Sequence, residues 1–159
     1  SGAATVTAPS AAIELNNAND FTTVTVLGAT TTNVTINDTN AIVLGGLDID
    51  GNLDVNAGGL LTDTGISVVD GTASFATTNS GSNITLTQLD IANAIDVTTA
   101  APSYVAVTAT YAIHLAPSNV HGALSITANT GGIRASGAVV VAGNLMMNHV
   151  IQSVINLVD

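Results

Sequence analysis

The stretch Gly51–Gly65, GNLDVNAGGLLTDTG, is matched further along the chain by Gly122–Gly137, GALSITANTGGIRASG, which is one residue longer. The spacing of the two stretches gives a period of about 71 residues, and their apolar positions agree better than their polar ones. In both, short runs of alternating apolar and polar residues are separated by Gly, Asn, Asp or Thr. Such alternation is typical of half-buried β-strands, and recurrence at a fixed spacing indicates a repeat architecture.

The same spacing relates other parts of the chain. The anchor Ile13-Glu14-Leu15 recurs as Ile84-Thr85-Leu86 and as Ile155-Asn156-Leu157. Further apolar pairs follow it: Val24 and Val26 with Ile95 and Val97, Val34 and Ile36 with Val105 and Val107, and Ile42 and Leu44 with Ile113 and Leu115. We therefore expect a single domain over residues 1–159, with repeat 1 at about 13–83, repeat 2 at about 84–154 and the start of a third repeat at 155–159.

Strands must carry the fold, because helical spacing of apolar residues is missing over most of the chain. The segments expected as strands include Thr23–Val26, Asn33–Asn37, Asn52–Asn56 and Thr72–Ala76. Short strands fit a sandwich, a barrel or a solenoid, and the position-by-position match between repeats favours stacked coils. We predict an all-β, right-handed parallel β-helix with about seven coils of about 20 to 24 residues, which makes a rod about 35 Å long.

The interior of such a rod is an aliphatic column. The chain is 47% hydrophobic and rich in Val, Ile, Leu and Thr, which argues against disorder. Inward side chains stack on one another from coil to coil, while Thr, Asn and Asp face water. The residues expected in the column, with their counterparts in repeat 2, are Val24, Val26, Val34, Ile36, Ile42, Leu44, Leu53, Val55 and Phe75.

Charge and composition exclude some classes of partner. The 159 residues include 11 acidic residues, one basic residue, Arg134, and no Cys. The net charge of −10 repels phosphate backbones, which excludes nucleic-acid binding. No apolar run reaches the about 18 residues of a spanning helix, so no transmembrane segment is expected. A surface rich in Thr, Asn, Ser and Gly and poor in basic residues is typical of bacterial outer-surface proteins, so we expect an extracellular, cell-surface location.

Three phrases of the sequence resemble a known family. They are GNLDVNAGGLLTDTG (51–65), VVDGTASFATTNSGSNITLTQ (68–88) and IELNNANDF (13–21), and they resemble the repeats of filamentous-haemagglutinin-type adhesins and related giant bacterial surface proteins. The resemblance implies a right-handed β-helix that is exported across the outer membrane and serves attachment, aggregation or cell contact. It brings no catalytic residues. The family's secretion module and membrane barrel are missing from this sequence, so we expect a window of a longer array or a small relative.

Four polar residues around Gly51 form a calcium candidate: Asp48, Asp50, Asn52 and Asp54. Hard cations bind several carboxylate and carbonyl oxygens, often around a tight glycine turn. Against this reading, strand alternation alone places these side chains outward, and repeat 2 has Asn, His, Ala and Ser at the matching positions. Calcium is the one cofactor that the sequence suggests, and the alternative is an outward-facing polar row.

The sequence favours a protein without catalysis. His114, His121 and His149 are scattered, with no thiolate or paired carboxylate at a ligand spacing, so we expect surface or turn histidines. Polysaccharide-active enzymes on β-helices need clustered carboxylates, basic residues and aromatic platforms. This chain has a single basic residue and no Trp.

Two tyrosines offer the remaining aromatic surface. Tyr104 replaces Asn33 of repeat 1 and Tyr111 replaces Asn40, a pattern that suggests neighbouring surface or core packing on successive coils. Contact of these rings with a host or cell-surface glycan is the alternative reading.

The last segment, LMMNHVIQSVINLVD (145–159), is apolar where its counterpart in repeat 1 is polar. Its β-branched content favours a strand over a helix. Neither end of the chain has the features of a cap, and an uncapped coil invites pairing with another chain or with further repeats. The segment is either an ordinary interior coil or an assembly contact, formed by Val150, Ile151, Val154, Ile155, Leu157 and Val158.

The functional expectation follows from the repeat. We expect a non-enzymatic structural or adhesive surface protein, whose β-helix acts as spacer and scaffold in attachment or cell contact. A self-assembling extracellular filament subunit that stacks head to tail is the closest alternative. A polysaccharide-active enzyme on the same scaffold would require turnover that depends on acidic residues such as Asp48 or Asp50.

Overall fold

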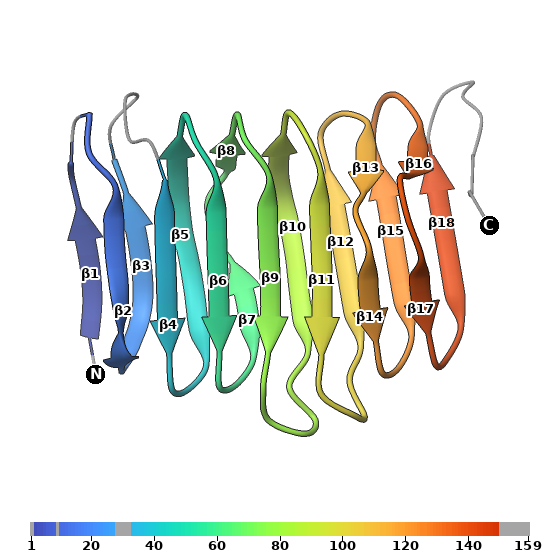
Figure 1. Cartoon of the computed structure of the whole chain (residues 1–159), viewed down its shortest axis with the longest axis horizontal. Helices are drawn as coiled ribbons and strands as arrows, with labels where there is room; N and C mark the ends of the chain where they lie inside the picture. The colour runs from blue at the N-terminus through green and yellow to red at the C-terminus, as the bar shows by residue number, and fades with distance from the viewer. Residues whose placement is uncertain (1, 9, 28–32, 150–159) are drawn as a thin grey trace.

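The structure is a computed structural model that describes residues 2–8, 10–27 and 33–149. The described chain consists of strands and turns, and none of its segments is a helix that is long and apolar enough to cross a membrane. The strands form two sheets that pack face to face (Figure 1). Sheet A contains β1 (Gly2–Val6), β3 (Phe21–Val26), β5 (Ile42–Ile49), β7 (Leu61–Asp63), β8 (Ser67–Val69), β10 (Ile84–Ile91), β12 (Val105–Ala109), β15 (Leu124–Ala128) and β18 (Leu145–His149). Sheet B contains β2 (Ile13–Asn19), β4 (Val34–Asp38), β6 (Leu53–Ala57), β9 (Ala73–Thr77), β11 (Ile95–Thr99), β13 (Ile113–Leu115), β14 (Ser118–Val120), β16 (Ile133–Ala135) and β17 (Val139–Val141).

The chain winds into a parallel β-solenoid of about seven coils, as the sequence predicts. Each coil runs along sheet A, turns, runs back along sheet B and then pairs in parallel with the next coil. In Figure 1 the chain descends the near sheet and climbs the far one while advancing from left to right, which is a right-handed coil. The cross-section is flattened, with two long sides. Paired residues of successive coils lie from 19 positions apart, as in Val34 and Leu53, to 23 positions apart, as in Leu61 and Ile84.

The core lies between the two sheets and is aliphatic along its length. Alternation along the strands in the middle of the solenoid buries every second side chain, so β4, β6, β12 and β15 all show the same alternating burial. Phe75 on β9 is the largest fully buried side chain. The predicted core is confirmed, since all of its named members are buried: Val24, Val26, Val34, Ile36, Ile42, Leu44, Leu53, Val55 and Phe75.

The long sequence repeat corresponds to three and a half coils. Each coil has two sides, one in sheet A and one in sheet B. Repeat 1 supplies seven such sides, from β2 to β9, with the short strands β7 and β8 together forming one side. Repeat 2 supplies seven more, from β10 to β18, with β13–β14 and β16–β17 as split sides. Because seven is odd, equivalent residues lie on opposite sheets: Ile13 is on β2 in sheet B, and Ile84 is on β10 in sheet A.

Side-chain amides link the turns of neighbouring coils. The Oδ1 of Asn33 accepts a hydrogen bond from the backbone N–H of Asn52 at 2.9 Å. The Oδ1 of Asn52 accepts from the backbone N–H of Thr72 at 2.9 Å and from its hydroxyl at 3.1 Å. These residues therefore belong to the turns, and β4, β6 and β9 each begin one residue later than the sequence predicts.

Some turns also need glycine, because successive coils approach closely there. A Cβ placed on Gly122 would lie 1.7 Å from the carbonyl oxygen of Ser103, and one on Gly58 would lie 2.0 Å from that of Thr39. Contacts this short are impossible for real atoms, so any larger residue would push the coils apart.

Candidate functional site

The predicted calcium residues are distributed around one edge of the solenoid. Asp48 is exposed on β5 and points outward from sheet A, while Asp54 points outward from β6 in sheet B. Asp50 and Asn52 lie in the turn between the two strands, and the side-chain oxygen of Asn52 already bonds Thr72. In the described part of the chain, no three His, Cys, Asp or Glu side chains lie close enough to hold a metal ion. The calcium site stays a prediction.

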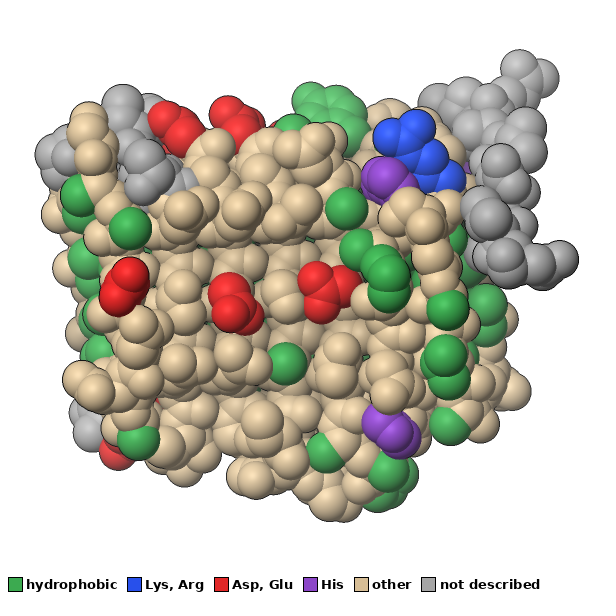
Figure 2. Space-filling view, in the orientation of Figure 1, with side chains coloured by type: hydrophobic (Ala, Val, Ile, Leu, Met, Phe, Trp, Pro, Cys, Tyr) green, Lys and Arg blue, Asp and Glu red, His purple; other side chains and the backbone are tan. Residues whose placement is uncertain are grey.

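Acidic side chains instead form a row across the outer face of sheet B. Strand register aligns Glu14 with Thr35, Thr35 with Asp54, Asp54 with Ser74, and Ser74 with Asp96. Figure 2 shows acidic side chains in red along this face, separated by polar neighbours. The Oγ of Ser74 donates a hydrogen bond to the Oδ2 of Asp96 at 3.0 Å. The parallel register therefore gathers carboxylates that lie far apart in the sequence.

Two carboxyls of this row have raised pKa values. Burial among neighbouring side chains raises the pKa of Asp54 above its usual value. Burial also raises the pKa of Asp96, and the negative charge of Asp54 raises it further, whereas the hydrogen bond from Ser74 opposes the shift. The ionised forms are thus disfavoured in the folded chain, because partial desolvation penalises the charge.

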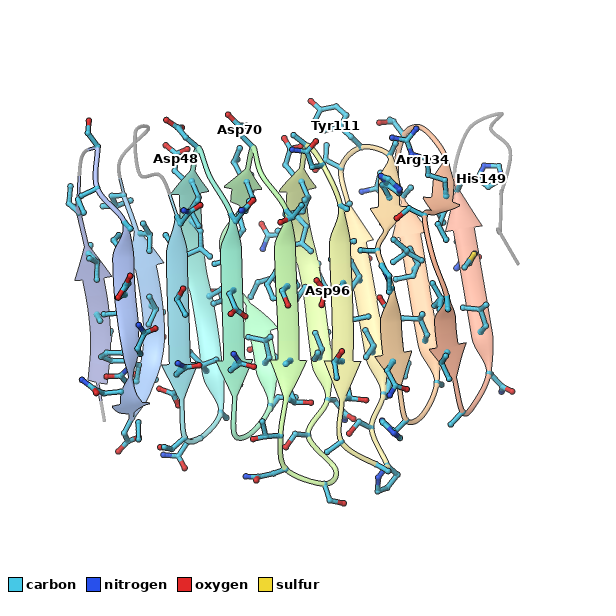
Figure 3. The ribbon with its side chains drawn as sticks, in the orientation of Figure 1. Asp48, Asp70, Asp96, Tyr111, Arg134 and His149 are labelled. Atoms are coloured by element: carbon cyan, nitrogen blue, oxygen red, sulfur yellow. The ribbon has the colours of Figure 1, made fainter. Side chains whose placement is uncertain are left out.

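The two tyrosines are not neighbours on successive coils, and this part of the sequence prediction is wrong. Both flank β12, so they belong to one coil, with Tyr104 before the strand and Tyr111 after it, at opposite edges of the sheet. Figure 3 shows Tyr111 at the upper edge. Both rings are exposed, Tyr104 by 42% and Tyr111 by 57%, which excludes core packing. Their spacing in the sequence fits a strand and its two turns, which is why the pattern misled.

The three histidines do not converge. His114 is on β13, His121 lies in the turn before β15, and His149 ends β18. The Nδ1 of His121 is in hydrogen-bond contact with the carbonyl oxygen of Thr99, and its backbone N–H donates to the hydroxyl of Thr99 at 3.1 Å. The structure thus places the three histidines at surface and turn positions, as the sequence predicts.

A pocket lies on sheet B where β13 extends past the start of the neighbouring strand β11. Its volume is about 240 Å³, and it lies at the edge of the solenoid that carries Asp48 and Asp70 (Figure 3). Strand register places His114 beside Arg134 on neighbouring coils, and in Figure 2 the basic side chain (blue) lies directly next to a histidine (purple). The lining residues are Ala92, Asn93, Ala112, Ile113, His114, Gly132, Ile133 and Arg134.

Sequence reasoning missed this pairing of His114 with Arg134. The signal that would have found it is the separation of His114 from the single Arg by about the length of one coil, in a chain that is otherwise acidic. The residues predicted as an assembly contact, Val150, Ile151, Val154, Ile155, Leu157 and Val158, lie outside the described residues. The predicted strand is confirmed only for the start of the segment, which is β18.

Comparison with known proteins gives a family match. A family described as repeats of unknown function (DUF5649) matches residues 1–28, 31–100 and 103–157. The starts of the second and third matches, at positions 31 and 103, are separated by close to the period of the sequence, which spans three and a half coils. No curated protein and no solved structure was found to match the chain.

Proposed function

Since the chain belongs to the DUF5649 family of repeats, we propose that it is a non-enzymatic segment of an extracellular bacterial surface protein, a β-helical scaffold that mediates attachment or cell contact. The resemblance of its repeats to those of filamentous-haemagglutinin-type adhesins supports the same role. A repeat family lengthens a protein by adding units of one kind, and attachment away from a cell surface requires such length.

The observation that carries the proposal is the continuity of the solenoid across the boundary between repeats. The last side of repeat 1, β9, pairs in full register with β11 of repeat 2. The core crosses the boundary without a gap, since Phe75, Ile84 and Val97 are all fully buried. Successive repeats therefore form one continuous solenoid rather than separate domains. A continuous solenoid keeps its two ends at a fixed distance from each other.

The outer faces fit an adhesive role in water. The outward-facing positions of sheets A and B, which alternate with the buried ones, are occupied largely by Thr, Asn, Ser and Asp. These short side chains lose little conformational entropy when a ligand contacts them. Rows of such groups, repeated at each coil, offer the same hydrogen-bonding partners many times to a polymeric ligand such as a glycan.

Surface display tests the attachment role. The chain is fused to an outer-membrane anchor of a non-adherent bacterium, and the fraction of cells retained on a glycan-coated surface under flow is measured. We expect retention to rise with the folded chain and to fall to background with Leu53→Asp, which places a charge in the core. Equal retention with both chains would contradict the proposal.

A filament subunit is the second candidate, and the way in which the coils stack favours it. Neighbouring coils pair in parallel through their backbones, as β12 does with β15 and β4 with β6. Their inward side chains are aliphatic and stack from coil to coil. A second copy of the same chain could supply both kinds of contact.

Negative-stain electron microscopy separates the two candidates. Purified chain is imaged over a concentration series, with and without EDTA. Long fibres of uniform width would support the filament subunit, and loss of those fibres in EDTA would support the predicted calcium site. Short single rods at every concentration would contradict self-assembly and leave the surface scaffold.

A further inference from the structure

The pocket beside His114 and Arg134 exists because sheet B has a step. Ile95, the first residue of β11, pairs with Leu115, the last residue of β13. Ile113 and His114 therefore extend past the start of β11, where the neighbouring coil is already turning at Ala92 and Asn93. The next coil keeps the step, because β16 pairs with β13 along its whole length.

Repeat 1 has the equivalent pairing but not the step, because Thr23 also pairs with Val43 and β3 begins two residues earlier, at Phe21. There Val24 pairs with Leu44, which is the equivalent of Ile95 with Leu115. The residue equivalent to Ala92 is Phe21, which begins β3 as part of the strand and packs against the core. Repeat 1 thus places an aromatic ring where repeat 2 has a methyl group.

The charges are also specific to repeat 2. The pair equivalent to His114 and Arg134 is Val43 and Thr62, which occupy the same register on β5 and β7. The opened step and the paired basic side chains therefore occur together, in one repeat and at one place. Two changes that coincide in this way point to a binding role, since neither is needed to continue the solenoid.

The chemistry of the lining defines the ligand. Arg134 offers a guanidinium that fits a carboxylate, and in the described chain it has no acidic partner. The amide nitrogen of Asn93 donates to the carbonyl of Asp70 at 2.8 Å, which leaves its Oδ1 to accept a hydrogen bond from a hydroxyl group. The exposed methyl groups of Ala92 and Ala112 supply a small apolar surface in the same lining. The volume of about 240 Å³ lies below the roughly 300–1,000 Å³ of drug-sized sites, and suits a single ring.

We propose that this pocket is a binding site for a sugar unit that carries a carboxylate. The carboxylate pairs with Arg134 and accepts a hydrogen bond from the imidazole N–H of His114, a hydroxyl group donates to Asn93, and the apolar face of the ring lies against Ala92 and Ala112. This proposal rests on the proposed attachment function, and it names the class of glycan that this repeat binds. That glycan is acidic, because Arg134 is a positive charge in an otherwise acidic chain.

A titration followed by amide chemical shifts tests the site on the isolated chain. The probes are glucuronate, glucose and acetate at equal ionic strength. We expect glucuronate to shift the amides of the pocket with a dissociation constant on the order of millimolar, as suits one charged contact in water. Glucose, which lacks the carboxylate, and acetate, which lacks the ring, should bind at least tenfold more weakly. Equal binding of glucose or acetate would overturn the assignment to acidic sugars.

Variants taken from repeat 1 provide the second arm. Arg134→Thr installs the residue found at the equivalent position and should weaken glucuronate binding at least tenfold, whereas Ala92→Phe should fill the pocket and abolish it. Asn119→Asp, on the exposed face of β14, changes the net charge by the same amount as Arg134→Thr and should bind like the unmodified chain. Dispersed spectra confirm that each variant is folded.

Undiminished binding by both pocket variants, or an equal loss with Asn119→Asp, would overturn the proposal. Because the titration uses a soluble monosaccharide and no cells, its failure leaves the attachment assay intact. Failure of the attachment assay likewise leaves the titration valid.

Discussion

Phe75 shows how much of this fold depends on single interior side chains. It is fully buried on β9, between the two sheets and close to the boundary between the repeats. The interior is otherwise aliphatic, so no other aromatic ring is fully buried among the described residues. A gap at this point would remove contacts from both sheets at once.

Replacing Phe75 with Ala is expected to destabilise the chain by about 3–5 kcal/mol, since it leaves a cavity in a close-packed core. Urea unfolding followed by circular dichroism measures this loss. Tyr111→Ala removes an exposed ring and should change the free energy of unfolding by less than about 0.5 kcal/mol. A loss at Phe75 no greater than that at Tyr111 would contradict the placement of the core.

Gly122 tests the close approach of coils at the turns. Gly122→Ala should cost about 1–3 kcal/mol, because the new methyl group would collide with the carbonyl of Ser103. The matched control is Gly2→Ala, where a Cβ would meet nothing within 4 Å. Thermal unfolding of the two variants should differ clearly, and equal melting temperatures would show that the coils are further apart than the structure has them.

At the scale of the strands, the sequence predicts position and alternation well and exact limits less well. The alternating pattern identifies the buried residues of β4, β6 and β9, because period two is a direct consequence of strand geometry. The one-residue shift arises from Asn33 and Asn52, whose amides bond the next coil. Paired residues of successive coils lie from 19 to 23 positions apart, so the separation of His114 and Arg134 by about one coil places them near each other without fixing their register.

The acidic row on sheet B makes stability depend on pH. The raised pKa of Asp96 means that its protonated form is favoured by folding. Its contribution is therefore most favourable at low pH and is lost as pH rises through the raised pKa, above the ordinary value of 3.8. Asp96→Asn should stabilise the chain at pH 7 by less than about 1 kcal/mol, because water screens a half-exposed carboxyl.

The control for this prediction is Asp48→Asn, which removes the same charge from the exposed face of sheet A. Urea unfolding at pH 7 and pH 3.5 compares the two variants. The gain from Asp96→Asn should exceed that from Asp48→Asn at pH 7 and disappear at pH 3.5. A gain that persists unchanged at the lower pH would show that charge burial is not its cause.

For the whole molecule, the period in the sequence and the period in space differ. The match between Ile13 and Ile84 predicts one long repeat, and the family match agrees with its length. Only the structure shows that this length is three and a half coils, so that the two residues lie on opposite sheets. Both sheets bury the same alternating pattern, and the sequence alone cannot distinguish one from the other.

This half-coil phase has a consequence for function. A feature that recurs in every repeat lies alternately on one face and on the other, and returns to the same face after two repeats. The pocket of repeat 2 and its filled counterpart in repeat 1 therefore lie on opposite sheets. Ligand-binding features on one face of a longer rod would be spaced by seven coils, or about 34 Å at about 4.8 Å per coil.

Disulfide trapping tests the parallel two-sheet register most directly, because the chain contains no cysteine of its own. Two double variants place cysteines at aligned outward positions of adjacent coils, Thr35→Cys with Asp54→Cys and Thr85→Cys with Ala106→Cys. A spacing of about 4.8 Å between strands is within the range that a disulfide bridges. Thr35→Cys with Thr85→Cys, on opposite sheets, is the control. We predict rapid crosslinking of both aligned pairs and none of the control, whereas crosslinking of the control pair, or of neither aligned pair, would contradict the solenoid and its register.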